Sequence, residues 1–168
     1  MKQLRPYQTD IVNRVRQAYL HGFKAPCVVL PCGGGKSVIV AEIAKRTTDK
    51  KNHVLFLVHR KELVDQIQKT FSYWGVDMKN ADIMMVQTAT RRVSKLQKPA
   101  LIITDESQHS PAKTYRRIYN SFPNVCRLGE ALQTACRRKT GGLLLCFNQA
   151  FNGYGGRGQK CRYFGRTH

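Results

Sequence analysis

Short runs of aliphatic residues alternate with longer amphipathic stretches from residue 6 to about residue 128. The aliphatic runs cover residues 27–30, 54–58, 83–86, 100–104 and 125–128, and they lack the regular polar alternation of half-exposed strands, so we expect strands buried on both faces. The stretches 6–21, 36–47, 60–73 and 111–121 repeat apolar residues at spacings of three and four, which predicts helices. Strands that alternate with helices indicate an α/β fold with a mostly parallel sheet flanked by helices.

The first aliphatic run leads into Gly33, Gly34 and Gly35, and Lys36 and Ser37 follow directly. Glycines allow backbone N–H groups to converge on phosphate oxygens, and a helix beginning near the lysine adds the positive end of its dipole. In a phosphate loop of this kind the lysine reaches the β- and γ-phosphates and the serine hydroxyl binds Mg²⁺. The pattern is incomplete, because Leu30 occupies the position of its first glycine, and the alternative is a glycine turn without a ligand.

The fourth aliphatic run ends in an adjacent pair of carboxylates, Asp105 and Glu106. A nucleotide-bound Mg²⁺ needs a carboxylate at the end of a neighbouring strand, and Asp105 suits this role. Glu106 would orient and deprotonate the attacking water. The alternative is an acidic residue pair at the start of a helix, where the helix dipole favours negative charge.

These segments resemble superfamily 2 helicases of the DEAD/DEAH type, and most closely the phage and bacterial DNA helicases related to restriction-enzyme motor subunits. The resemblance covers about residues 4–128, and its motifs occur in the order of the family, at residues 4–8, 33–37, 58–63, 86–88 and 105–109. It implies a RecA-like phosphate-loop domain that uses ATP and Mg²⁺ and acts on nucleic acid, with DNA favoured over RNA.

The resemblance also implies roles by position. Gln8 would recognise adenine, in a pocket shaped by Arg5 and Tyr7. The loop residues that would hold the phosphates and the metal are Gly33, Gly34, Gly35, Lys36 and Ser37. Taken singly, Gln8 also fits a helix cap and Tyr7 a core residue.

Three further residues would connect the nucleotide with nucleic acid. His109 would link the nucleotide state to the nucleic-acid track, and Arg60 and Thr88 would contact phosphates of one strand. The alternative for Arg60 is a solvated residue at the start of a helix.

The family pattern breaks down after residue 128. Only Thr134 and Ala135 hint at the motif that should follow the fifth strand, and the chain is too short for a second RecA-like domain. We therefore divide the chain into a RecA-like domain, 1–128, and an irregular basic tail rich in glycine and arginine, 129–168. We hypothesise a truncated or frameshifted remnant of a longer helicase, weakly active or inactive alone, whose partner is a second motor domain or a nuclease subunit in trans.

The net charge of +19 points to a polyanionic partner. About +12 lies in residues 1–130 and +7 in residues 131–168. A solvated basic surface is the simplest alternative. Two rival functions also remain open: a non-catalytic nucleic-acid-binding fragment with a vestigial nucleotide site, and a small-molecule kinase that shares the phosphate loop.

The six cysteines form no C-x-x-C pair. A zinc site can be drawn, but its spacing matches no usual pattern, so we expect reduced thiols; its ligands would be Cys136, Cys146, Cys161 and His168. No apolar run approaches the roughly 20 residues that span a bilayer, and the N-terminal residues lead into no signal-peptide-like stretch. We expect a cytoplasmic protein without a membrane partner.

Overall fold

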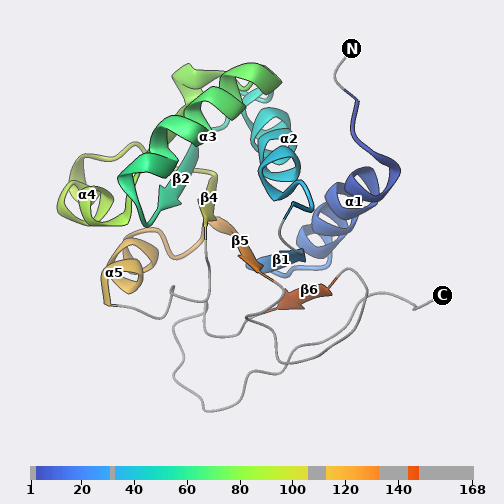
Figure 1. The fold of residues 1–168 in the computed structure, drawn as a ribbon. Coiled ribbons are helices and arrows are strands. Elements are labelled where there is room, and N and C mark those ends of the chain that lie inside the picture. Colours follow the sequence, from blue (N-terminus) through green and yellow to red (C-terminus); the bar gives the residue numbers. More distant parts are fainter. Residues whose placement is uncertain (1–2, 31–32, 106–112, 133–143, 148–168) are drawn as a thin grey trace.

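The computed structural model describes residues 3–30, 33–105, 113–132 and 144–147. One sheet of six strands, in the order β3-β2-β4-β5-β1-β6, runs through the middle of the domain (Figure 1). Strands β1 to β5 are parallel, and β6 pairs antiparallel with β1. The strands are β1 Pro26–Leu30, β2 Val54–Val58, β3 Ala81–Met85, β4 Leu101–Thr104, β5 Cys126–Leu132 and β6 Leu144–Phe147.

Helices cover both faces of the sheet (Figure 1). The α-helices are α1 Pro6–Leu20, α2 Lys36–Thr48, α3 Lys61–Trp74, α4 Val86–Arg91 and α5 Lys113–Ser121, and the 3₁₀ helices are η1 Met78–Asn80 and η2 Val93–Lys95. None of the described helices has the length and hydropathy needed to cross a membrane.

Strand β2 shows why the sheet needs both layers. Its five residues are all buried, and their side chains point alternately to opposite faces of the sheet. Phe56 packs in the core beneath α1, α2 and α3, whereas Leu55 and Leu57 pack in a second core beneath α4 and α5. A strand with apolar residues on both faces is therefore stable only between two layers of helices.

The predicted mostly parallel α/β sheet flanked by helices is confirmed. All five predicted strands and four predicted helices are present, with small shifts at their ends. The prediction was wrong at Val86, which begins α4 rather than ending a strand. Its side chain is buried with Ala89 in the core beneath α4 and α5, and a helix of six residues is too short to show a helical period.

The fifth strand is longer than the sequence indicates. It extends to Leu132 because its second half pairs with β1, where Gly129 lies opposite Cys27 and Leu132 lies opposite Leu30. The domain boundary that we placed after residue 128 falls within this strand. Strand β6 lies in the segment for which composition indicates irregular structure.

We expect Phe71→Ala to lower the free energy of unfolding by about 3–5 kcal/mol, because it removes a fully buried ring from the core. The Phe71 ring packs edge-on against Phe56, with 5.6 Å between the ring centroids. Tyr73→Ala, two residues along the same helix, is the control, since Tyr73 is 65% exposed and its loss should cost about 1 kcal/mol or less. Chemical denaturation measures both, and equal losses would contradict this packing.

Candidate functional site

The predicted site residues gather where the parallel strands end. Strand β1 ends at Leu30 and its loop leads to Lys36 at the start of α2, while β4 ends at Thr104 and Asp105 follows. Only β5 lies between these two strands, so they are two inter-strand spacings apart, about 10 Å. Gly129 of β5 pairs with both Cys27 and Thr104, so β1 continues three residues beyond the level at which β4 ends. The loop that follows β1 therefore begins beyond the level of Asp105, in the direction in which the parallel strands run.

The loop enters α2 through glycines with backbone conformations that other residues rarely adopt. Gly33 has φ +77° and Gly35 has φ +68°. Gly35 caps α2, and its carbonyl oxygen accepts hydrogen bonds from Val38 N at 3.1 Å and Ile39 N at 3.2 Å. The N–H groups of the first turn have no acceptor within the helix, and together with the helix dipole they favour an anion.

Lys36 occupies the first position of this helix, and its side chain is half-buried. Its ammonium group donates a hydrogen bond to the carbonyl oxygen of Leu30 at 3.5 Å. The side chain therefore folds back across the loop towards the end of β1.

The start of α1 packs against this loop. Gln8 is only 5% exposed, and its Oε1 accepts a hydrogen bond from Arg5 N at 2.9 Å. The Gln8 Nε2 atom lies 2.4 Å from the position that a Cβ on Gly35 would occupy. Tyr7 Oη donates to the carbonyl oxygen of Gly34 at 3.3 Å. Gln8 thus caps the helix, which was the alternative interpretation of this residue, and it also contacts the phosphate loop. The alternative for Tyr7, a core residue, was wrong, because Tyr7 is 40% exposed.

Asp105 is half-buried, and its backbone N–H donates to Leu57 O at 3.1 Å, which continues the pairing of β4 with β2. Directly before it, the buried Thr104 hydroxyl is hydrogen-bonded to the Tyr119 hydroxyl at 2.9 Å. Burial raises the pKa of Tyr119, so its hydroxyl stays protonated across the physiological range. This hydrogen bond fixes α5 to the end of β4 beside Asp105.

Arg127 supports Tyr119 from β5. Its guanidinium carbon lies 4.5 Å from the centre of the Tyr119 ring, and its Nη2 donates to the Tyr119 carbonyl oxygen at 3.4 Å. Burial lowers the pKa of Arg127 from its usual value. The sequence analysis missed this network, although a lone arginine within the aliphatic strand was a signal for a buried partner.

Arg60 and Thr88 lie at the same edge of the sheet as the loop but at its other end. Arg60 is exposed before α3, directly after β2, and Thr88 is half-buried in α4, which follows β3. Strands β2 and β3 are adjacent and lie three and four positions from β1 in the sheet. The predicted nucleic-acid contacts are therefore roughly 15–20 Å from the phosphate loop along this edge.

Several predictions fall outside the described residues. These are the roles of Glu106 and His109, the displaced motif at Thr134 and Ala135, and the zinc site, whose four candidate side chains are not among those described. Among the side chains that are described, no three from His, Cys, Asp or Glu lie close enough together to hold a metal ion.

Sequence comparisons match residues 1–130 to the family described as "Type III restriction enzyme, res subunit". The chain is 50% identical over 99 residues to a "51.5 kDa protein" of a Lactococcus phage (isolate 7-9), which covers 59% of this chain and 22% of the relative. It is 31% identical over 145 residues to the "putative ATP-dependent helicase IRC3" of Saccharomyces cerevisiae, covering 71% of this chain and 21% of the relative. The chain thus spans about a fifth of the length of these relatives.

Solved helicase structures share the fold. The Pyrococcus furiosus Hef helicase domain has a TM-score of 0.62 at 20% identity, with 83% of this chain and 34% of that chain covered. The UvsW helicase of bacteriophage T4 has a TM-score of 0.60 at 17% identity, with 77% of this chain and 52% of that chain covered. The Sulfolobus solfataricus SWI2/SNF2 ATPase core was solved in complex with double-stranded DNA. It has a TM-score of 0.57 at 14% identity, with 78% of this chain and 32% of that chain covered.

We expect Gly35→Ala to reduce the free energy of unfolding more than Gly33→Ala, by about 1 kcal/mol or more. Both substitutions place a side chain at positive φ, which costs about 1–2 kcal/mol. Only at Gly35 does the new Cβ collide with Gln8, whose hydrogen bond to Arg5 would then be strained. Among the described residues that are not its chain neighbours, none has an atom within 4 Å of the Cβ position at Gly33.

Chemical denaturation without nucleotide measures the difference. Adding Gln8→Ala to each variant completes a double-mutant cycle, and it should relieve the extra cost at Gly35 but not at Gly33. Equal costs at the two glycines, or no coupling to Gln8, would contradict the contact.

The family match covers most of the chain, the fold is that of helicase cores, and the phosphate loop lies at the edge where the strands end. The chain belongs to the Type III restriction enzyme res-subunit family, and its described part is an N-terminal, RecA-like ATP-binding domain of the superfamily 2 helicase type.

Proposed function

We propose that this chain is the first motor domain of an ATP-dependent DNA helicase or translocase, and that it binds Mg-ATP and nucleic acid at the same edge of its sheet. The observation that carries the proposal is the packing of α1 on the phosphate loop. There Gln8 lies against Gly35, and the Tyr7 hydroxyl is hydrogen-bonded to the Gly34 carbonyl oxygen. This packing joins the proposed adenine-reading residues to the proposed phosphate-binding residues in one site.

The loop is built for a phosphate group. A side chain on Gly35 would meet Gln8, and the glycines and the start of α2 would present backbone N–H groups to an anion. Lys36 would move its ammonium group from the Leu30 carbonyl oxygen to the β- and γ-phosphates. The adenine ring would lie beside Gln8, with Arg5 and Tyr7 next to it.

The oxygen ligands near the loop suit Mg²⁺, which prefers hard oxygen donors and keeps several waters. The Ser37 hydroxyl would bind the ion directly and the Asp105 carboxylate through water. When bound, the ion would neutralise charge on the phosphate oxygens. Glu106 would orient and deprotonate the attacking water, and His109 would relate the nucleotide state to the nucleic-acid track.

DNA is the favoured nucleic acid. The family is described by a restriction-enzyme subunit, and one structure with the same fold was solved with double-stranded DNA. Arg60 and Thr88 lie at the strand-end edge, where their side chains would contact phosphates of one strand. The high positive charge would attract the polyanion over a longer range.

Full activity requires a second RecA-like domain or a nuclease subunit, in the same polypeptide or in trans. The matched part of this chain covers only about a fifth of each of the two relatives. In phosphoryl transfer, arginine fingers from a second domain contribute about 10³–10⁵ in rate, so this chain alone should hydrolyse ATP weakly or not at all. Strand movement would also need opening and closing between two domains.

Two substitutions separate nucleotide binding from hydrolysis. Lys36→Ala should abolish Mg-ATP binding, because it removes the cation that meets the phosphates, whereas Glu106→Gln should keep binding and lose hydrolysis. Calorimetric titration measures binding, and release of phosphate with and without single-stranded DNA measures hydrolysis.

The same measurements decide between the proposed function and its rivals. Nucleotide binding that Lys36→Ala leaves unchanged would sink the phosphate-loop assignment. Salt-dependent DNA binding without any nucleotide binding would favour a nucleic-acid-binding fragment with a vestigial site. Nucleotide turnover that needs a small-molecule acceptor and ignores DNA would favour a kinase.

A further inference from the structure

Charge is distributed unequally between the two helical layers. Six acidic residues belong to the α1–α3 side, namely Asp10, Glu42, Asp49, Glu62, Asp65 and Asp77. Four ion pairs on that side neutralise lysines and arginines, at N–O distances of 2.6 to 3.5 Å. The helices α4, η2 and α5 contain no acidic residue at all.

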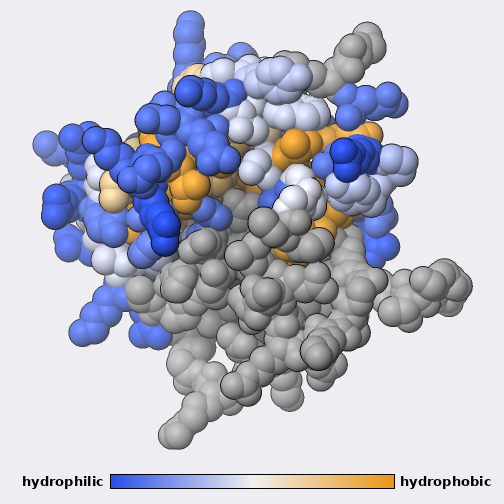
Figure 2. All heavy atoms as spheres, viewed as in Figure 1, coloured by the Kyte–Doolittle hydropathy of each residue, from blue (hydrophilic) through white to orange (hydrophobic). Residues whose placement is uncertain are grey.

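The opposite layer carries exposed cations instead. We call these the basic flank: Arg91, Arg92, Lys95, Lys98, Lys113, Arg116 and Arg117. None of them forms an ion pair with a carboxylate among the described residues. Helices α4 and α5 lie side by side, and Thr90 Oγ1 of α4 donates to Thr114 O of α5 at 3.2 Å, so the flank is one surface (Figure 1). Figure 2 shows mostly hydrophilic side chains over this part of the molecule, at the left of the view.

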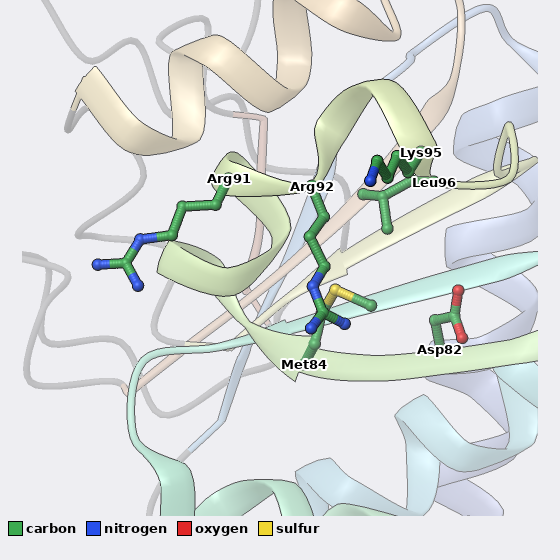
Figure 3. A pocket seen from close by; sticks show the side chains of 6 residues that line it. All are labelled: Asp82, Met84, Arg91, Arg92, Lys95 and Leu96. Carbon is green, nitrogen blue, oxygen red and sulfur yellow. The ribbon is translucent and has the colours of Figure 1, made fainter.

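A surface pocket of about 480 Å³ lies in the basic flank, where α4 and η2 meet β3, the edge strand of the sheet. Arg92 reaches down towards Met84, Lys95 lies beside Leu96, and Arg91, which also lines the pocket, extends to the left of the view (Figure 3). The pocket thus combines three cations with two apolar side chains, and the cations suit the phosphate oxygens of a nucleic-acid backbone.

One carboxylate, Asp82, also lines the pocket. It lies on β3, to the right of Arg92 in Figure 3, and its Oδ2 is 3.4 Å from His53 Nε2. The cations of the flank therefore outnumber this carboxylate, and their charge is available to an external anion.

Among the residues that the structure describes, the flank offers no exposed aromatic ring on which unpaired bases could stack. The aromatic side chains of α5 that the structure describes, Tyr115 and Tyr119, are buried. The described aromatic residues with large exposed fractions are Tyr7 and Tyr73, and both belong to the α1–α3 side. Single-stranded nucleic acid is usually held by bases stacked on exposed aromatic rings, whereas cations spread over two helices fit the phosphates of a duplex.

We propose that the basic flank is a second nucleic-acid contact surface, which binds the phosphate backbone of a duplex beside the strand-end edge that holds Arg60 and Thr88. This deepens the proposed function, since it takes nucleic acid as the partner, but it requires neither nucleotide nor the phosphate loop. Contacts to the backbone would carry little sequence information and would position the duplex next to the motor domain.

The test is duplex binding by the full chain without nucleotide, measured by fluorescence anisotropy over a range of salt concentrations. Arg92→Glu/Lys95→Glu should weaken binding about tenfold or more and reduce the slope of log affinity against log salt by about two, roughly one for each lost phosphate contact. The control, Arg16→Glu/Lys69→Glu, changes net charge equally at exposed positions on the α1–α3 side and should have a much smaller effect. If the reversed charges impair folding, the neutral variant Arg92→Gln/Lys95→Gln replaces Arg92→Glu/Lys95→Glu in the same measurement.

Equal losses in the flank and control variants would overturn the proposal, as would unchanged duplex binding or a loss confined to single strands. These outcomes are distinct from a failure of the proposed function, which would appear as absent nucleotide binding in the unmodified chain. A flank variant that loses duplex binding while retaining nucleotide binding supports the proposal.

Discussion

A Cβ on Gly35 would lie 2.4 Å from Gln8 Nε2, so a side chain at this position would force Gln8 to shift. Gln8 cannot easily move aside, since it is buried and its Oε1 accepts a hydrogen bond from the backbone N–H of Arg5. This contact holds the start of α1 against the phosphate loop and would determine which groups surround the nucleotide in the proposed site. The positive φ of Gly35 is the second part of the same constraint, since it turns the chain into α2 with its N–H groups directed outward.

The sheet then determines how the sites are separated. The phosphate loop follows β1 near one side of the sheet, whereas Arg60 and Thr88 follow β2 and β3 at the other side. Asp105 lies between them, after β4. The hydrogen bond between the Thr104 and Tyr119 hydroxyls holds this strand end against α5. The same α5, packed beside α4, carries three of the seven residues of the basic flank, Lys113, Arg116 and Arg117. A nucleotide-dependent shift near Asp105 would thus have a direct structural connection to the proposed duplex surface.

The fold could be predicted from the sequence because buried strands and amphipathic helices leave clear local patterns; β2, for example, was predicted with its observed ends. Val86 was misassigned because local apolar character does not distinguish a strand end from a helix of one or two turns. In the site, neighbouring residues such as Lys36 and Ser37 were identifiable from their order alone. The contact between Gln8 and Gly35, the network of Thr104, Tyr119 and Arg127, and the pocket at Arg92 join residues far apart in the chain, so only the folded structure reveals them.

We infer that the phosphate loop and the start of α1 form one nucleotide site. Amide chemical shifts in ¹⁵N-labelled protein, recorded during titration with Mg-ATP, test it most directly. The largest changes should occur at Gly33, Gly34, Gly35, Lys36 and Ser37 and at the side-chain amide of Gln8, with little change at Arg92 and Lys95. Unchanged loop amides, or shifts centred on the basic flank, would contradict the claim.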